Sequence, residues 1–393
     1  MKNVFSILVT VAALIFMSAS CDNGTDPVPD PFDGNVTSNI SENTTWETGN
    51  VYTLGGRIAV LDGVTLTIEP GVIVKGEAGT GPNATALVVA RGATLIAEGT
   101  PTQPIIFTSV ADEIEPGDIA SPNLDPTLNG LWGGVIVLGN APISADAASV
   151  QIEGIPASDQ NGLYGGSDAS DNSGSIKYIS IRHGGANIGE GNEINGLTLG
   201  GVGSGTTIEN VEIVSNQDDG IEWFGGAVSV SNVVVWNTGD DAIDTDQAWS
   251  GTLDNFAIIN PGDECFELDG GEGDFNEEHT ITNGTILARD AEGLADLDDK
   301  GAAGTVGNSK VNMNNLYFLG IKAGQDFDDN PADLTASSME VVLPAGTAVA
   351  DFFTKGTDAF VTAVDSLSNT VGADISKLDS WSWAGVSGAL NGL

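Results

Sequence analysis

Apolar and polar positions alternate along the chain in a repeat that is clearest between Ile208 and Asp269. Three segments align there: IENVEIVSNQDDGIEWF, VSNVVVWNTGDDAIDTD and LDNFAIINPGDECFELD. Asn210, Asn232 and Asn255 fall in register, at intervals of 22 and then 23 residues. Short alternating runs that end in Asn, Gly or Asp are typical of the coils of a solenoid. The pattern predicts an all-β fold, a single-stranded right-handed parallel β-helix.

The same alternation extends in both directions from this repeat. Short runs separated by Gly, Asp-Gly and Pro-Gly begin at Thr45, and two looser coils follow Asp269. The polar segments VADEIEPGDIASPNLDPTLNG and Gly162–Gly174 predict long loops that leave the coils on one side. We therefore expect a β-helix domain with irregular loops over residues 45–345.

The period changes near the C-terminus. Apolar residues recur there at helical spacing, at Phe353, Phe360, Val364 and Leu367. A solenoid needs its last open edge covered, because unpaired strand edges invite association. Residues 346–393 are therefore predicted to form a short, partly helical C-terminal cap.

The first twenty residues predict export. Lys2 precedes an apolar stretch, Val4–Met17, that is too short to span a bilayer comfortably. Ser18-Ala19-Ser20-Cys21 resembles a lipobox, although Ser18 replaces the usual Leu. The resemblance implies a signal peptide over residues 1–20, cleavage before Cys21 and acylation of Cys21, which would anchor the protein to the outer membrane at the cell surface. The alternative is an ordinary secretory signal with an incidental Cys.

Cysteine usage and local composition refine this N-terminal prediction. Cys21 and Cys265 are the only two cysteines, and a disulfide between them would tie a linker to a central coil. We expect Cys265 to be a packed or partly exposed free thiol. Residues 21–44 are rich in Pro, Asp, Gly and Ser and predict a disordered tether between the lipid and the domain.

The chain is strongly acidic, with 55 acidic against 12 basic side chains and a formal charge of −43. Such a surface repels phosphate backbones, so a nucleic-acid partner is not expected. Two interpretations remain for the charge. It keeps the surface hydrated, as in salty water, or part of it binds divalent cations.

Stacking the three coils places their acidic side chains in rows. Ile221, Ile243 and Phe266 share one parity and are predicted to point inward, so that the acids next to them point outward. Gly220, Ala242 and Cys265 are expected on this outer face, leaving the carboxylates accessible. The row and the acidic pairs at the preceding turns comprise Asp218, Asp219, Glu222, Asp240, Asp241, Asp244, Asp263, Glu264 and Glu267. Oxygen ligands at this density suit Ca²⁺, and the alternative is a solvated acidic face.

An enzymatic alternative rests on TGDDAID, which resembles a motif of polygalacturonase-type glycoside hydrolases. That resemblance implies catalytic roles for Asp219, Asp240 and Asp241, one protonated and one ionised. The His and Arg-Lys motifs of that family are not found downstream, and His183 is more simply explained as a structural imidazole. A polysaccharide lyase fits less well, because lyases need Lys or Arg and residues 208–275 contain neither.

Three longer motifs, GLWGGVIVLGNAPI, SIRHGGANIGEGNEINGLTLGGVGSGT and DDGIEWFGG, resemble a family of Bacteroidota-type surface lipoproteins. The resemblance covers most of Thr45–Trp383 and implies a β-helix without an established activity. The sequence thus predicts a lipid-anchored, non-catalytic binding or structural protein whose ligand is a glycan, a receptor partner at the outer membrane, or Ca²⁺. The alternative is a carbohydrate-active β-helix enzyme, a glycoside hydrolase or a polysaccharide lyase.

Overall fold

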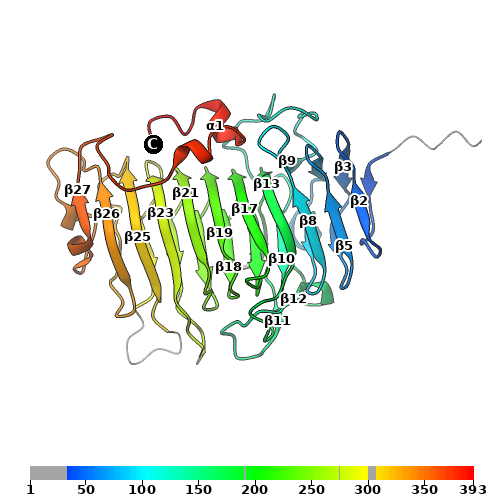
Figure 1. Ribbon diagram of the computed structural model, residues 1–393, viewed down its shortest axis with the longest axis horizontal. Helices are drawn as coiled ribbons and strands as arrows, with labels where there is room; N and C mark the ends of the chain where they lie inside the picture. Colours follow the sequence, from blue (N-terminus) through cyan, green and yellow to red (C-terminus); the bar gives the residue numbers. More distant parts are fainter. Residues whose placement is uncertain (1–32, 190–191, 274, 300–306) are drawn as a thin grey trace, which may run out of the picture. The chain divides into compact units, whose positions relative to one another are not determined.

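Two parallel β-sheets form the walls of a solenoid in the computed structural model, which describes residues 33–189, 192–273, 275–299 and 307–393 (Figure 1). Residues 34–393 form one compact unit. Successive coils pair in parallel, each strand with its counterpart in the next coil. These features confirm the predicted parallel β-helix.

The larger sheet, sheet A, has fifteen strands among the described residues, and the smaller, sheet B, has eight. Sheet A contains β1 (Asn35–Val36), β2 (Thr44–Trp46), β3 (Val51–Leu54), β5 (Thr65–Ile68), β6 (Ile73–Gly76), β8 (Thr94–Glu98), β9 (Ile105–Ser109), β13 (Gly174–Arg182), β17 (Thr207–Val214), β19 (Val230–Trp236), β21 (Thr252–Ile259), β23 (His279–Leu287), β25 (Val311–Leu319), β26 (Thr335–Val341) and β27 (Val361–Ala363). Sheet B contains β4 (Arg57–Val60), β7 (Ala86–Val89), β10 (Val135–Leu138), β16 (Leu197–Gly200), β18 (Ile221–Phe224), β20 (Ile243–Asp246), β22 (Phe266–Leu268) and β24 (Asp296–Leu297).

Short elements lie outside these two sheets. Two strand pairs belong to the loops that leave the coils, β11 (Val150–Gln151) with β12 (Leu163–Tyr164) and β14 (Ala186–Gly189) with β15 (Asn192–Ile194). Among the described residues the helical elements are the 3₁₀ turns η1 (Gly81–Asn83), η2 (Gln160–Gly162), η4 (Val349–Asp351), η5 (Thr357–Phe360) and η6 (Ile375–Lys377), and the helix α1 (Trp383–Ser387). No helix in the described part of the chain is long and apolar enough to cross a membrane.

The long strands of sheet A bend at one left-handed residue each. β8 and β9 pair with the two halves of β13, and Tyr178 stands between these halves with φ +50°. Asn is the residue other than Gly that best tolerates this conformation. Asn occupies the bend in the next five long strands, where the residues with positive φ are Asn210, Asn232, Asn255, Asn283 and Asn315.

Hydrogen bonds also join these asparagines from coil to coil. The Asn255 amide donates to Asn232 at 2.8 Å, and Asn315 donates to Asn283 at 3.1 Å. The register that the sequence predicted for the asparagines is therefore correct, and their role in the fold is structural.

Inside the solenoid, stacked apolar side chains form a single core. Ile221, Ile243 and Phe266 pair in register and are fully buried, as the alternation predicted. In the neighbouring row, Trp223 stacks on Trp249 with ring centroids 4.6 Å apart. Each buried side chain of this size contributes about 1.5–3 kcal/mol of hydrophobic stabilisation, so the stacked rows dominate the stability of the coils.

The solenoid begins earlier than the sequence indicated. β1 pairs with β3, and Ile40 is buried and bridges to Val60, although residues 21–44 were predicted to be a tether. Single apolar residues in a polar stretch gave no alternation from which a strand could be inferred. Residues 1–32, which include the predicted signal peptide, Cys21 and most of the tether, lie outside the described part of the chain.

The C-terminal region does more than cover the last coil. Phe353 packs on Phe318 and Phe327 at that end, and β27 extends sheet A by one strand. The chain then turns back, and residues 370–393, which we call the strap, run over the outer face of sheet A as far as β13 (red in Figure 1). The predicted cap, residues 346–393, thus contains one segment at the end of the solenoid and one along its side.

Candidate functional site

The predicted acidic row exists and lies on the outer face of sheet B. Glu222 of β18 pairs with Asp244 of β20, and Asp244 pairs with Glu267 of β22. The same outer row is apolar in the first coils and becomes polar at Thr198 of β16. Its apolar members are Ala59, Val88 and Ile136.

The row continues beyond the three acids that the sequence analysis identified. Asp296 of β24 pairs with Glu267, and a bridge between Ala295 and Phe327 places Asp328 next after Asp296. We call the five outer acids the acidic ladder: Glu222, Asp244, Glu267, Asp296 and Asp328. The last two were missed because coil length changes after Asp269. The signal available was an acid directly after a buried residue, in Ala295-Asp296 and Phe327-Asp328.

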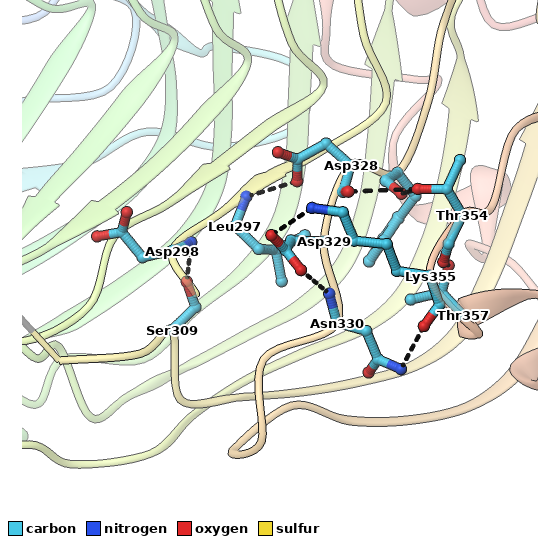
Figure 2. A network of polar contacts seen from close by, with 10 residues as sticks. Leu297, Asp298, Ser309, Asp328, Asp329, Asn330, Thr354, Lys355 and Thr357 are labelled. Atoms are coloured by element: carbon cyan, nitrogen blue, oxygen red, sulfur yellow. Dashed lines mark hydrogen bonds and ion pairs between the residues drawn. The ribbon is translucent and has the colours of Figure 1, made fainter. Parts of the chain in front are cut away.

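Ordered hydrogen bonds surround the far end of the acidic ladder (Figure 2). Asp328 accepts from the main-chain N–H of Leu297 at 3.0 Å, and Lys355 binds Asp329 at 2.6 Å. Lys355 also lowers the pKa of Asp328, although burial is the larger effect and raises that pKa to about 6. This end of the ladder therefore has a cation beside it.

The centre of the ladder is buried, which corrects the expectation of accessible carboxylates. Glu222 is 6% exposed and Asp244 is 9% exposed. The loop between β10 and β13 covers this part of the outer face, and its Ile152, Ile155 and Tyr164 pack in one apolar cluster with Phe224. Long loops, and not the strands themselves, thus decide how much of the ladder meets solvent.

A second correction concerns the small residues before the acids. Ala242 and Cys265 are fully buried in the core and do not lie on the outer face. They precede the strands, where the chain is still turning, so the alternation of the strand does not apply to them. The Cys265 thiol is free, as predicted, and burial raises its pKa well above the usual value.

The acidic pairs at the turns have two different roles. Asp219 accepts a hydrogen bond from the main-chain N–H of Asp241 at 3.0 Å, and Asp241 accepts one from Glu264 at 2.6 Å. The second acid of a pair therefore caps the turn of the following coil. The first acids, Asp218 and Asp240, are half-buried.

Two groups of three carboxylates among the described residues have ligand atoms within 4.8 Å of one another. The outer triad is Asp218, Asp219 and Asp240, and the inner triad is Asp219, Glu222 and Asp244. Asp219 belongs to both. The structure thus brings five of the nine predicted metal-ligating residues into these triads, while Asp241, Asp263, Glu264 and Glu267 lie beside them.

Asn195 adds a neutral group to the inner triad. It is fully buried, and its amide nitrogen donates to Glu222 and, at 3.3 Å, to Glu153 of the covering loop. Its amide oxygen has no hydrogen-bond partner among the described residues. Neither Asn195 nor Glu153 was predicted from the sequence, because both reach the ladder through loops.

Burial raises the pKa of the carboxyls in both triads, and the charges of neighbouring acids raise it further. The pKa of Asp219, Glu222 and Asp244 lies well above the ordinary value, and those of Asp218 and Asp240 rise to about 8 and about 6. The pKa of Asp241 rises to about 11 for the same first cause. None of the nine predicted ligands forms an ion pair with Lys, Arg or His in the described part of the chain.

Neither histidine forms a hydrogen bond or ion pair with these carboxylates in the described part of the chain. His183 shares a 2.6 Å hydrogen bond between its Nδ1 and the Leu128 carbonyl, and His279 is buried beside Trp249. Burial lowers the pKa of His279 to about 3, so this imidazole stays neutral. All seven tryptophans fall in described segments and are buried, so they provide no exposed aromatic platform for a sugar ring.

Comparison with known proteins agrees with this architecture. A family model for a pectate-lyase-like β-helix domain matches residues 38–382. Comparisons with curated proteins and with solved structures gave no significant match. The match covers nearly the whole solenoid, and on this basis the chain belongs to the family of pectate-lyase-like β-helix domains.

Proposed function

We propose that the protein is an exported, lipid-anchored β-helix protein that binds Ca²⁺ through the two carboxylate triads and acts as a non-catalytic binding or structural component at the cell surface. One observation carries the Ca²⁺ proposal. Two triads share Asp219 and gather their oxygens within 4.8 Å, with no cationic side chain paired to them in the described residues.

The electrostatics of the inner triad support a bound cation. Asp219, Glu222 and Asp244 are each less than 10% exposed. Ionised carboxylates in such a place lose hydration and repel one another, which costs stability unless protons or a cation compensate. Near neutral pH a divalent cation compensates several carboxylates at once, and Ca²⁺ accepts the irregular sets of six to eight oxygens that such a cluster provides.

An ion in the inner triad and an ion in the outer triad would differ in their exposure to solvent. The inner triad would hold a buried ion, to which Asn195 can contribute an amide oxygen after rotation of the amide. The outer triad would hold an ion that meets solvent, because Asp218 and Asp240 are half-buried. Asp219 would contact both ions.

The proposed cellular location of the protein rests on its N-terminal sequence and on a family resemblance. The lipobox-like Ser18-Ala19-Ser20-Cys21 supports acylation of Cys21, and resemblance to Bacteroidota-type surface lipoproteins supports an outer-membrane location. A receptor partner or glycan at the cell surface remains part of the proposal. Any glycan would have to be recognised by polar groups and Ca²⁺, because the tryptophans are buried.

A second candidate function is hydrolysis of a polysaccharide, as the resemblance of TGDDAID implies. It is favoured by the separation of two pKa values at adjacent residues, about 6 for Asp240 and about 11 for Asp241. Near pH 7 such a pair supplies one ionised and one protonated carboxyl. Against it, Asp219 and Asp241 are buried and already accept main-chain hydrogen bonds.

Titration calorimetry with Ca²⁺ tests the proposal directly. We expect saturable binding that Glu222→Gln weakens at least tenfold, while Glu209→Gln, which changes a half-exposed carboxylate on sheet A that lies 4.0 Å from Lys177, leaves binding unchanged. Absence of binding heat, together with the same melting temperature in Ca²⁺ and in EGTA, would show that the acids form a solvated face. Turnover of a neutral or acidic polysaccharide that Asp241→Asn abolishes would favour the hydrolase instead.

A further inference from the structure

Hydrogen bonds attach the strap to four strands of sheet A. Four main-chain N–H groups of the strap donate to side chains of sheet A, at Glu340 of β26 (2.6 Å), Thr285 of β23 (2.9 Å), Asn255 of β21 (2.6 Å) and Glu212 of β17 (2.8 Å). The strap therefore crosses sheet A from β26 to β17, and these four bonds do not depend on its side chains.

Apolar side chains complete the attachment at the far end of the strap. Leu378, Trp383, Ala384 and Leu390 pack with the outer apolar residues of sheet A in one cluster. Trp383 lies edge-on to Trp236 and His183, with ring centroids 5.8 and 5.6 Å apart. Trp383 is thus one anchor of the strap, and Trp381, which lies edge-on to Tyr178 with ring centroids 5.7 Å apart, is another.

Beneath Trp383 lies a buried ion pair. Arg182 and Glu212 are both fully buried, and an Arg182 nitrogen is 3.7 Å from a Glu212 oxygen. Ser180 joins them, because it accepts from Arg182 at 2.7 Å and donates to Glu212 at 2.5 Å. The Arg182 guanidinium also lies 4.9 Å from the centre of the Trp383 ring.

Covering this ion pair is costly. Both terminal guanidinium nitrogens of Arg182 and the Nε2 atom of His183 are buried without a hydrogen-bond partner among the described residues. Burying an ion pair often costs as much as it gains, and each buried polar group left unpaired costs its lost hydration. These costs offset much of what the apolar contacts of Trp383 and Leu378 contribute.

The coils do not need the strap to complete their own hydrogen bonding. β13, β17, β19 and β21 pair strand to strand beneath it, and no described residue after Ala363 forms a strand. The strap adds no strand to the sheet beneath it, and a segment that lies over an intact sheet can open locally without global unfolding.

We propose that the strap is a releasable cover: residues 370–393 leave the outer face of sheet A as a unit while the coils stay folded. Release rehydrates Arg182 and Glu212 and presents a guanidinium, an imidazole and the Trp236 ring on one face. In a chain with 12 basic and 55 acidic side chains, this face differs from the remainder of the surface. The device is independent of the Ca²⁺ proposal, since it uses neither triad.

Hydrogen exchange on the full-length protein tests this proposal. We expect amides of the strap to exchange at least roughly tenfold faster than those of β17 and β19 under conditions where the protein is folded. Trp383→Ala should accelerate exchange of the strap further and leave β19 protected. Val386→Ala is the matched control, because Val386 lies in the same helix and is 50% exposed.

Limited proteolysis gives a second readout. Lys377 lies in the strap with a side chain 58% exposed, so trypsin should cut there faster in Trp383→Ala than in Val386→Ala and leave the solenoid intact. Equal exchange rates for the strap and for β17 and β19 in the unsubstituted protein would overturn the proposal. So would a Trp383→Ala substitution that deprotects strap and sheet to the same extent.

Discussion

Asp219 accepts a 3.0 Å hydrogen bond from the main-chain N–H of Asp241 in the next coil, and it is also the residue common to both carboxylate triads. One side chain thus holds the turn of the next coil and carries a charge that needs compensation. The hydrogen bond requires only an acceptor oxygen, whereas cation binding requires the negative charge. The two roles can therefore be separated by substitution.

Asp219→Asn should keep the acceptor oxygen and lose the charge. We expect its melting temperature in EGTA to equal or exceed that of the unsubstituted protein, because Asn is neutral at every pH whereas the buried Asp219 is neutral only while it keeps its proton. Ca²⁺ at about a hundred times its dissociation constant stabilises a protein by about 2.7 kcal/mol, a shift of about 4 °C, and this shift should disappear in the variant. Asp219→Ala, which also loses the hydrogen bond, should melt lower in both buffers. A full Ca²⁺ shift in Asp219→Asn would remove Asp219 from the site.

Stability without Ca²⁺ should depend on pH in a defined direction. The folded-state pKa is raised to about 6 for Asp240, about 7 for Glu153 and about 8 for Asp218 and Glu264, from ordinary values of 3.8 for Asp and 4.5 for Glu. At pH values between the ordinary pKa and the raised pKa of these groups, the folded protein binds more protons than the unfolded chain. The free energy of unfolding therefore falls as pH rises.

Melting curves in EGTA from pH 5 to pH 8 should therefore show a decreasing melting temperature. Ca²⁺ should reduce the decrease, because it replaces the protons at the carboxylates. The opposite trend in EGTA, a melting temperature that rises over this range, would mean that the triads are not the groups that control stability.

Cys21→Ala should move the protein from the membrane fraction to the soluble exported fraction, because the acylated thiol is the proposed anchor. Cys265→Ala is the control for loss of a cysteine, since Cys265 is fully buried in the core, and it should stay with the membrane. Fractionation followed by immunoblotting measures both. Retention of Cys21→Ala in the membrane fraction would rule out the anchor.

The bend in sheet A predicts an order among substitutions at Asn232. This residue has φ +58° and accepts the 2.8 Å hydrogen bond from Asn255. Asn232→Ala should lower the free energy of unfolding by about 2 kcal/mol, because Ala disfavours the left-handed conformation and loses the hydrogen bond. Asn232→Gly should cost less, since Gly adopts positive φ freely. Chemical denaturation compares the two, and equal losses would show that the conformation contributes nothing.

Regular coils made much of the fold predictable from sequence. Because Glu222, Asp244 and Glu267 occupy equivalent places in repeats of nearly constant length, their pairing followed from counting residues. Asp296 and Asp328 were not predicted to belong to this row, because coil length changes after Asp269. Ala242 and Cys265 were misplaced, since the rule of alternation holds in strands and these residues lie in turns.

Burial of the site was not predictable in the same way. Glu153, Tyr164 and Asn195 reach the acids through loops, and nothing in a period of 22 or 23 residues says where a loop will fold back. The strap presents the same difficulty, because Ala384 and Glu212 are far apart in sequence and meet through a hydrogen bond from the main-chain N–H of Ala384.

The outer row of sheet B changes from Ala59, Val88 and Ile136 to Glu222, Asp244 and Glu267 along one line of equivalent positions. Each coil therefore contributes one residue to this line, independently of the others. Gain or loss of a coil by duplication or deletion would change the number of carboxylates in whole steps without redesigning the fold. The number of positive ions that such a sheet face can bind therefore depends on the number of coils. Genetic changes that leave every existing coil unaltered can raise or lower it.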